Sequence, residues 1–148
     1  MPTGTLLSER QATTEQDRVT TCRTDAVRLA VVGIALDATH GVYEEEHRTP
    51  HPFEVDVELD VEIREALVSD HLEDTVDQQE VVRVVQEVSQ ERQFNLIESF
   101  AHAISCKILN RFPRVTTTHV VVRKLAPYNL GSTACTKADI VSSRTERR

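Results

Sequence analysis

Regular alternation of apolar and acidic residues marks the segment Phe53 to Ile63, in which every second residue is apolar and those between are all Glu or Asp. Such alternation is typical of a strand with one buried face. Three further segments are rich in β-branched residues and predict strands: Val27 to Leu36, Val115 to Lys124 and Thr133 to Val141. Gly33 is expected to form a bulge within the first of them.

Between the second and third predicted strands the apolar spacing changes to that of helices. A helix is predicted over residues 79–91, where apolar residues recur at intervals of three and four: Val81, Val84, Val85 and Val88. A second helix is predicted over residues 95–111, because Asn95 suits the N-cap and Glu98 would complete a capping box; Pro113 then ends it. This order favours an α+β fold, in which a four-stranded antiparallel sheet carries two helices on one face.

The length of 148 residues is usual for a single domain. We expect that domain to span residues 26–142, after a disordered tail (1–25) that lacks apolar periodicity and before a C-terminal tail (143–148). No apolar run approaches the roughly 18 residues that a membrane span requires, and the first residues do not resemble a secretory signal. A cytoplasmic protein is therefore expected.

The net charge of −7 argues against nucleic acid or an anionic membrane as the main partner. Its distribution is uneven, with 18 acidic and 4 basic residues over 37–98 but 2 acidic and 9 basic over 99–148. Solvated faces explain this simply, although opposite patches also suit neighbouring subunits. The open edges of a four-stranded sheet are often paired between subunits, so a homo-oligomer is expected.

Three places in the sequence could carry chemistry. The first is the run of glutamates ending at Glu46, in a loop that begins with His40 and Gly41; a solvated charge run is the alternative. The second is Glu98, whose carboxylate could cap its helix or accept two parallel N–H bonds from a guanidine-like edge, as on pterins and guanine. The third is Lys124 at a strand end, where an exposed base is the simpler interpretation.

Metal binding has little support in the sequence. The three cysteines lie far apart and show no zinc-type spacing. His40, His47 and His51 match no common metal site. We therefore expect no metal.

Five short motifs occur in one order on these elements: Gly-Val-x-x-x-Glu (41–46), Pro-Phe-x-Val-Asp-Val (52–57), Asp-Thr-Val-Asp (74–77), Leu-Ile-Glu (96–98) and the strand-end Lys124. Together they resemble the dihydroneopterin aldolase family of folate biosynthesis, over about Val27 to Val141. The resemblance implies the tunnelling fold, in which antiparallel sheets of several subunits, here a tetramer or octamer, form a barrel with active sites at the interfaces. It also implies cleavage of 7,8-dihydroneopterin, a small-molecule pterin, to 6-hydroxymethyl-7,8-dihydropterin and glycolaldehyde without a cofactor.

The resemblance also implies roles for particular residues. Glu46 would organise water and the substrate side chain, and Lys124 would manage proton transfer. Apart from the resemblance, charge repulsion predicts that the neighbouring Arg123 helps to lower the pKa of Lys124. Glu98 would grip the amino group and ring N–H of the pterin, beside the backbone of Ile97. The stretch Asp74, Thr75, Val76 and Asp77 would pack around the ring from the adjoining subunit, and Gln78, which follows it, would also lie at the substrate.

The chain departs from the family pattern at three positions. Gln78 stands where the family usually has a tyrosine that stacks on the pterin and helps to protonate the enol intermediate. Pro50-His51 replaces Gly-Gln, and Leu125 replaces the proline after the lysine.

Because Gln78 replaces the family tyrosine, other activities on the same ligand are also considered. An epimerase of dihydroneopterin or its triphosphate, a cofactor-free oxygenase and a non-catalytic pterin- or purine-binding oligomer are the alternatives to the aldolase. Tyr43 or Tyr128 could supply the missing phenol, since both flank matched positions.

Overall fold

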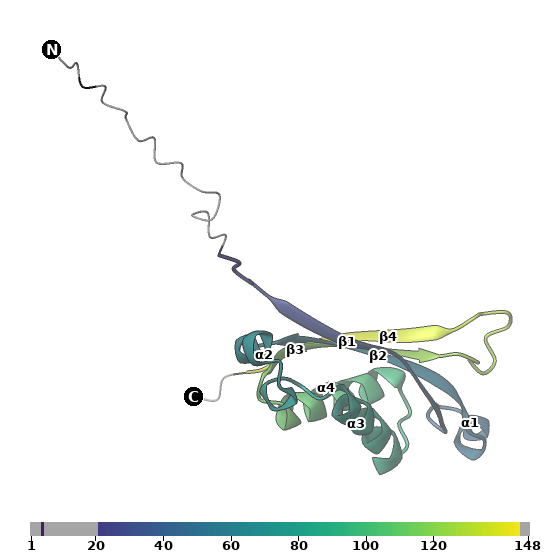
Figure 1. The fold of residues 1–148 in the computed structure, drawn as a ribbon. Helices are drawn as coiled ribbons and strands as arrows, with labels where there is room; N and C mark the ends of the chain where they lie inside the picture. Colours follow the sequence, from purple (N-terminus) through teal and green to yellow (C-terminus); the bar gives the residue numbers. More distant parts are fainter. Residues whose placement is uncertain (1–3, 5–20, 146–148) are drawn as a thin grey trace.

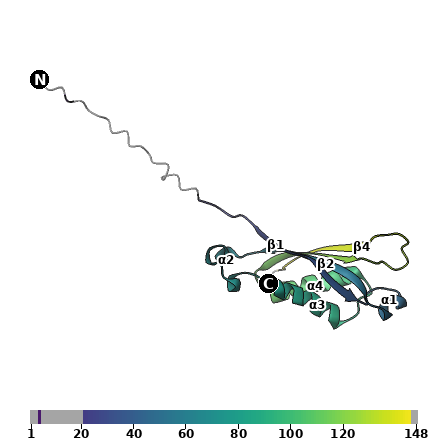
Figure 2. The same ribbon diagram turned by 45° about the vertical axis from the view of Figure 1, so that its right-hand side comes forward.

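A four-stranded antiparallel sheet in the order β1-β2-β3-β4 carries two long helices on one face (Figure 1, Figure 2). This computed structural model describes residue 4 and residues 21–145. The strands are β1 (Val27–Ala38), β2 (His51–Val61), β3 (Val115–Lys124) and β4 (Thr136–Ser143), and the long helices are α3 (Gln78–Glu91) and α4 (Ile97–Arg111). The predicted α+β class and element order are confirmed.

The alternation in β2 separates the two faces of the sheet. Phe53, Val55 and Val57 are fully buried beneath the helices, whereas the Glu and Asp residues between them lie on the open face. The predicted bulge at Gly33 is present, because the β1–β2 register shifts between Val31 and Ile34 and Gly33 has a φ of +77°. The Gly33 N–H donates to the Asp56 carboxylate at 2.8 Å, which holds the bulge against β2.

The core lies between the sheet and the two helices. Val81, Val84, Val85 and Val88 of α3 are buried, as their spacing predicted. Phe100, Ile104 and Ile108 supply the buried side of α4. No helix within the described residues is long and apolar enough to span a membrane.

Three short elements accompany these, namely α1 (Glu44–Arg48), α2 (Arg64–Ser69) and the 3-10 turn η2 (Leu72–Asp74). The sequence did not predict α1, which is too short to show a periodicity. Its first turn consists of three glutamates, a charge that the positive end of a helix favours. Figure 1 shows α1 and α2 at opposite ends of the sheet.

Two predicted boundaries were wrong. α4 begins at Ile97 with Leu96 as its N-cap and no side-chain cap, so Asn95 lies outside the helix and the expected capping box with Glu98 does not form. The last strand begins at Thr136 instead of Thr133, because the β3–β4 connection continues through turns with positive φ at 129 and 131.

The first strand begins at Val27 and the last strand ends at Ser143. Most of the predicted N-terminal tail (1–25) lies outside the described residues, and residues 21–26 form an exposed extended segment before β1. At the other end β4 runs to Ser143, and the guanidinium of Arg144 donates to the backbone oxygens of Phe112 and Val115 at 3.0 and 3.1 Å. The ordered fold therefore extends into the first residues of the predicted C-terminal tail.

Candidate active site

A buried ion pair joins two of the predicted catalytic residues. The Lys124 ammonium donates to Oε2 of Glu46 at 2.7 Å, and the side chains are only 12% and 4% exposed. Lys124 is the last residue of β3, and Glu46 lies in α1, which connects β1 to β2. Glu46 is therefore not part of a solvated charge run, unlike the exposed Glu44 and Glu45 before it.

Gly41 allows Glu46 to reach this position. Its φ is +153°, and a Cβ at this residue would overlap the Glu46 carboxyl group. The other carboxylate oxygen faces the backbone N–H of Tyr43 at 3.5 Å. Because only glycine combines this backbone conformation with the absence of a side chain, the Gly-Val-x-x-x-Glu motif is a steric requirement of the Glu46–Lys124 pair.

His40 connects this loop to the start of α4. It is 2% exposed, and its Nδ1 accepts the Phe94 N–H at 3.0 Å while Nε2 lies 3.0 Å from Oγ of Ser89. The Gly41 N–H donates to the Phe94 carbonyl at 2.9 Å. Burial lowers the pKa of His40 to about 4, and the charges of His51 and Lys124 act in the same direction. His40 is therefore neutral at physiological pH, a structural role that the sequence did not indicate.

Glu98 lies in the first turn of α4 and is exposed. Its carboxylate has no hydrogen-bond or ion-pair partner within the part of the chain that the structure describes, so capping does not account for it. Ile97, the first residue of the helix, presents one of the N–H groups that a helix leaves unpaired at its start. The ring of Phe100, two residues after Glu98, contacts the His40 ring with centroids 4.6 Å apart, so this turn begins at the end of the sheet that holds Glu46.

Arg123 does not crowd Lys124, contrary to the prediction. Successive strand residues face opposite sides of the sheet, and the Arg123 guanidinium donates to Asp56 at 2.6 Å on the open face. The hydrogen bond to Asp56 raises the pKa of Arg123. The immediate charged neighbour of Lys124 is therefore the carboxylate of Glu46 and not a second cation.

Val76, Asp77 and Gln78 lie far from this pair within one chain. Val76 is buried in the core, the Asp77 carboxylate caps α3 by accepting the Gln79 N–H at 2.9 Å, and Gln78 is exposed. They line a hollow of about 410 Å³ with Leu29 of β1.

The register of the strands gives the distance between this hollow and the Glu46–Lys124 pair. Leu29 pairs with Leu59, whereas Lys124 pairs with Phe53, six residues away along β2. The two sets of site residues are thus about 20 Å apart along the sheet. One chain does not bring them together.

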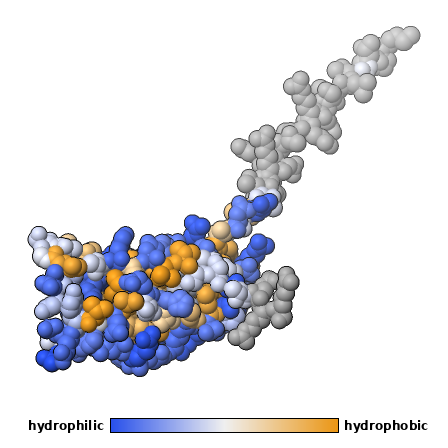
Figure 3. Space-filling model, turned by 180° about the vertical axis from the view of Figure 1, so that it is seen from behind, coloured by the Kyte–Doolittle hydropathy of each residue, from blue (hydrophilic) through white to orange (hydrophobic). Residues whose placement is uncertain are grey.

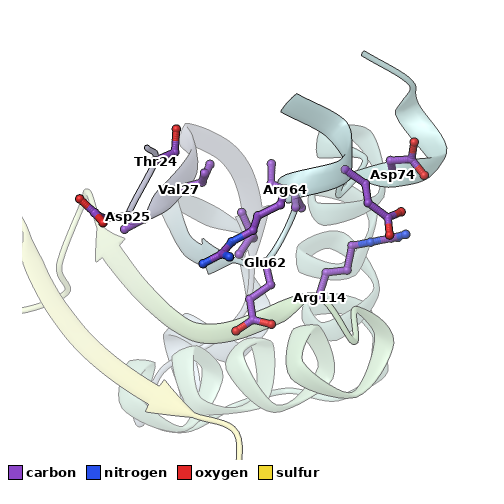
Figure 4. Close-up of a pocket in the computed structure, with 11 residues that line it drawn as sticks. Thr24, Asp25, Val27, Glu62, Arg64, Asp74 and Arg114 are labelled. Carbon is purple, nitrogen blue, oxygen red and sulfur yellow. The ribbon is translucent and has the colours of Figure 1, made fainter. Parts of the chain in front are cut away.

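A larger hollow of about 550 Å³ lies at the same distant end, beside the start of β1 (Figure 4). Arg64 and Arg114 line it together with Asp25, Glu62 and Asp74. None of the residues in the Glu46–Lys124 pair or the first turn of α4 belongs to it. Its mixed charges point to no particular ligand.

Tyr43 and Tyr128 contact one another, with ring centroids 5.1 Å apart. Tyr43 precedes α1, and Tyr128 follows Lys124 by four residues in the β3–β4 connection, so the two rings come from the segments that carry the ion pair. Both phenols are partly exposed. These are the two tyrosines of the chain, and both belong to the Lys124 end of the sheet.

The histidines of the loop bind protein groups. His47 Nε2 lies 2.5 Å from the Gly41 carbonyl oxygen, and His51 Nε2 lies 2.9 Å from that of His40. Among the described residues no three His, Cys, Asp or Glu side chains are grouped as metal ligands would be.

The sheet with its two helices and the strand-end lysine are features of the tunnelling-fold aldolases, which are carbon–carbon lyases. The family model described as dihydroneopterin aldolase matches residues 29–140. A dihydroneopterin aldolase of Streptococcus pyogenes is 33% identical over 100 residues, which cover 68% of this chain and 84% of that protein. The chain belongs to the dihydroneopterin aldolase family, whose activity lies in folate biosynthesis.

Solved structures agree on the fold. Escherichia coli dihydroneopterin aldolase in complex with neopterin superposes with a TM-score of 0.72 at 20% identity, covering 79% of this chain and 99% of that one. A Burkholderia dihydroneopterin aldolase bound to guanine gives a TM-score of 0.67 at 19% identity, covering 82% and 93%. The predicted tunnelling-type fold of the single chain is thereby confirmed.

Proposed function

We propose that this protein cleaves 7,8-dihydroneopterin into 6-hydroxymethyl-7,8-dihydropterin and glycolaldehyde, using Lys124 and Glu46 for proton transfer. The observation that carries the proposal is the buried Glu46–Lys124 pair at the end of β3. Family membership supports the reaction, and the neopterin and guanine bound to two structural relatives support a ligand of this shape.

Glu98 is the proposed anchor of the pterin. Its exposed carboxylate at a helix start has two oxygens, which match the amino group and the neighbouring ring N–H of a 2-amino-4-oxopyrimidine. The N–H of Ile97 is available to a ring acceptor beside it. A charge-assisted bidentate contact of this kind fixes the orientation of the ring as well as its affinity.

The reaction requires proton transfer and an electron sink. A base takes the proton of the 2′-hydroxyl, the C1′–C2′ bond breaks, and glycolaldehyde leaves with the new carbonyl group. The electron pair of the broken bond forms a double bond between C1′ and the adjacent ring carbon, the π pair of the ring C=N bond moves onto its nitrogen, and that nitrogen takes a proton, which gives an enol. The enol carbon then takes a proton and the ring nitrogen loses one, which restores the C=N bond. Lys124 and Glu46, acting through water, are suited to carry these protons.

The working site is proposed to lie between two subunits of a homo-oligomer. Glu46, Lys124 and Glu98 of one chain would face Val76, Asp77 and Gln78 of a neighbour, because the two sets are about 20 Å apart in one chain.

The edge strands support this assembly. Within the described part of the chain, β1 and β4 each pair on one side only, and both expose an apolar residue, with Val32 73% and Val141 66% exposed. Figure 3 shows apolar side chains in patches among hydrophilic ones on the face that it presents. Such edges are suited to pairing with another chain.

The missing phenol is the point at which the reaction could take another course. The described residues that line the hollow at Gln78 include no aromatic side chain. An enol that is not promptly protonated can react with oxygen or add glycolaldehyde back on its other face, which would give an oxygenase or an epimerase. Tyr43 and Tyr128 are the candidate donors that would keep the reaction on the aldolase course.

Product analysis tests the proposed activity. The purified protein is incubated with 7,8-dihydroneopterin under air and under argon, and the pterins are separated. Hydroxymethyldihydropterin with an equal amount of glycolaldehyde is expected under both gases. An oxidised pterin under air only, an epimerised neopterin, or bound but unchanged ligand would each contradict the aldolase assignment and favour one of its alternatives.

Subunit complementation tests the shared site. Glu98→Ala protein and protein altered at Asp77 and Gln78 are each expected to be inactive, and mixing them with subunit exchange should restore some sites with both halves intact. If proven exchange leaves the mixture inactive, both halves lie in one chain and the interface proposal is wrong.

A further inference from the structure

His51 lies against the proposed catalytic pair. It is the first residue of β2, and its side chain is 14% exposed. Its Nε2 is 3.6 Å from Oε2 of Glu46, the same oxygen that accepts the Lys124 ammonium at 2.7 Å. A single carboxylate oxygen therefore faces a lysine on one side and a histidine on the other.

Three contacts hold the His51 ring in this orientation. Its Nε2 lies 2.9 Å from the His40 carbonyl oxygen, and its Nδ1 lies 3.2 Å from that of Thr49. The ring also contacts Phe53, with centroids 4.9 Å apart. A neutral imidazole has only one N–H, so His51 donates to both carbonyl oxygens only as the cation. The surroundings of the ring suit a second positive charge beside Glu46.

The ionisable groups that face this imidazole come from three elements. Glu46 approaches from α1 and Lys124 from β3, and their charges are opposite. His40, from the β1–α1 connection, offers its carbonyl group, and its own ring is neutral because burial lowers its pKa to about 4. Glu46 is therefore the one carboxylate that these elements turn toward His51.

We infer that His51 is a positioning residue. Its charge determines how strongly the Glu46 carboxylate attracts the Lys124 ammonium, and therefore how readily Lys124 gives up its proton. This inference rests on the proposed function of the pair. As a cation, His51 attracts the Glu46 oxygen and repels the ammonium, which weakens the hold on the lysine proton. As a neutral ring, His51 exerts neither force, and the Glu46 carboxylate then interacts with the Lys124 ammonium alone. The glutamine usual in the family at this position carries no charge in either state.

The consequence is a break in the pH profile. If neutral Lys124 is the base, log kcat rises steadily with pH until His51 loses its proton, and the rise then pauses because the lysine proton is held more strongly. Imidazoles ordinarily titrate between about pH 5 and 8. A straight line through the log kcat values measured under pH 6 is extended to pH 8. We expect the measured kcat at pH 8 to be lower than this line by about threefold or more.

The experiment measures kcat for hydroxymethyldihydropterin formation from pH 5.5 to 8.5. The wild-type profile should show the break, and His51→Gln, which installs the family residue, should give a straight line. His119→Gln is the matched control, because His119 pairs with the Asp139 carboxylate on the open face of the sheet. This control should keep the break.

An unbroken wild-type profile would overturn the inference without any variant, and so would a break that persists in His51→Gln. If wild-type protein forms no hydroxymethyldihydropterin at any pH, the proposed function fails and the inference fails with it. If product forms but the pH profile has no break, the proposed role of His51 is rejected and the proposed function is not. The two failures are thus separate observations.

Discussion

Acid should weaken the fold at the active site because His40 is buried as a neutral ring. It joins the Glu46 loop to α4 through the bond from the Phe94 N–H to Nδ1, and a protonated ring could not accept that bond. The pKa of His40 is lowered from 6.5 to about 4, chiefly by burial. The unfolded chain therefore binds a proton at a pH at which the folded chain does not, so this stabilisation is complete above the unfolded pKa and is lost as pH falls from about 6.5 to 4.

The size of the effect follows from the shift. One pKa unit corresponds to about 1.4 kcal/mol, so the fold loses about 3 kcal/mol in full and about 2 kcal/mol by pH 5 from this one group. This is a substantial part of the 5–15 kcal/mol that typically separates folded from unfolded protein.

The assay compares the free energy of unfolding of wild-type protein and His40→Asn at pH 7.5 and pH 5, at one protein concentration because of the expected oligomer. Asparagine offers an oxygen acceptor to the Phe94 N–H but does not titrate. At pH 7.5 the variant should be less stable, since it loses contacts with the rings of Phe53, Phe94 and Phe100. At pH 5 this deficit should shrink by about 2 kcal/mol. A deficit that does not change with pH would refute the reasoning.

Three further substitutions test the proposed site. Glu98→Gln should weaken pterin binding by roughly 1.5–3 kcal/mol without lowering the melting temperature, because the carboxylate makes no capping bond; retained binding with a lower melting temperature would contradict this. Lys124→Gln, which keeps a donor for Glu46, should lower kcat about 100-fold or more with a much smaller change in pterin affinity, and equal losses in both would reject the proton-transfer role. Gln78→Tyr, which adds a phenol that can protonate the enol, should raise the rate of hydroxymethyldihydropterin formation and lower any oxygen-dependent product, where a tenfold gain in rate equals about 1.4 kcal/mol; an unchanged rate would mean that Tyr43, Tyr128 or water already donates the proton.

The Glu46–Lys124 pair also gives the lysine a direct partner for proton transfer, which does not depend on Arg123. A carboxylate and an ammonium 2.7 Å apart can exchange one proton between them, and a substrate hydroxyl brought to the pair through water would join that exchange. Both side chains are nearly buried, so few bulk water molecules compete for their charges. Groups inside the protein, with His51 as the proposed example, therefore determine how readily this pair exchanges a proton.

The hydrophobic pattern alone determined the four strands, the two long helices and the side of each that is buried. Alternation in β2 and the i, i+3, i+4 spacing in α3 are local properties, since a strand or helix must bury its apolar face wherever it packs. The bulge at Gly33 was also predictable, because glycine within a β-rich run is typical of such a break. Short motifs further identified Glu46, Glu98 and Lys124 as candidates.

Only the tertiary structure decided what those candidates touch. Glu46 and Lys124 are 78 residues apart in the chain, and their contact depends on the folding of α1 over the end of β3, which Gly41 permits by leaving space for a carboxylate. The same packing makes His40 a neutral buried link and brings His51 to Glu46, two contacts that the sequence did not indicate. The local sequence pattern indicates which face of a strand or helix a residue occupies. The residues that it contacts on that face belong to distant segments, which the local pattern does not describe.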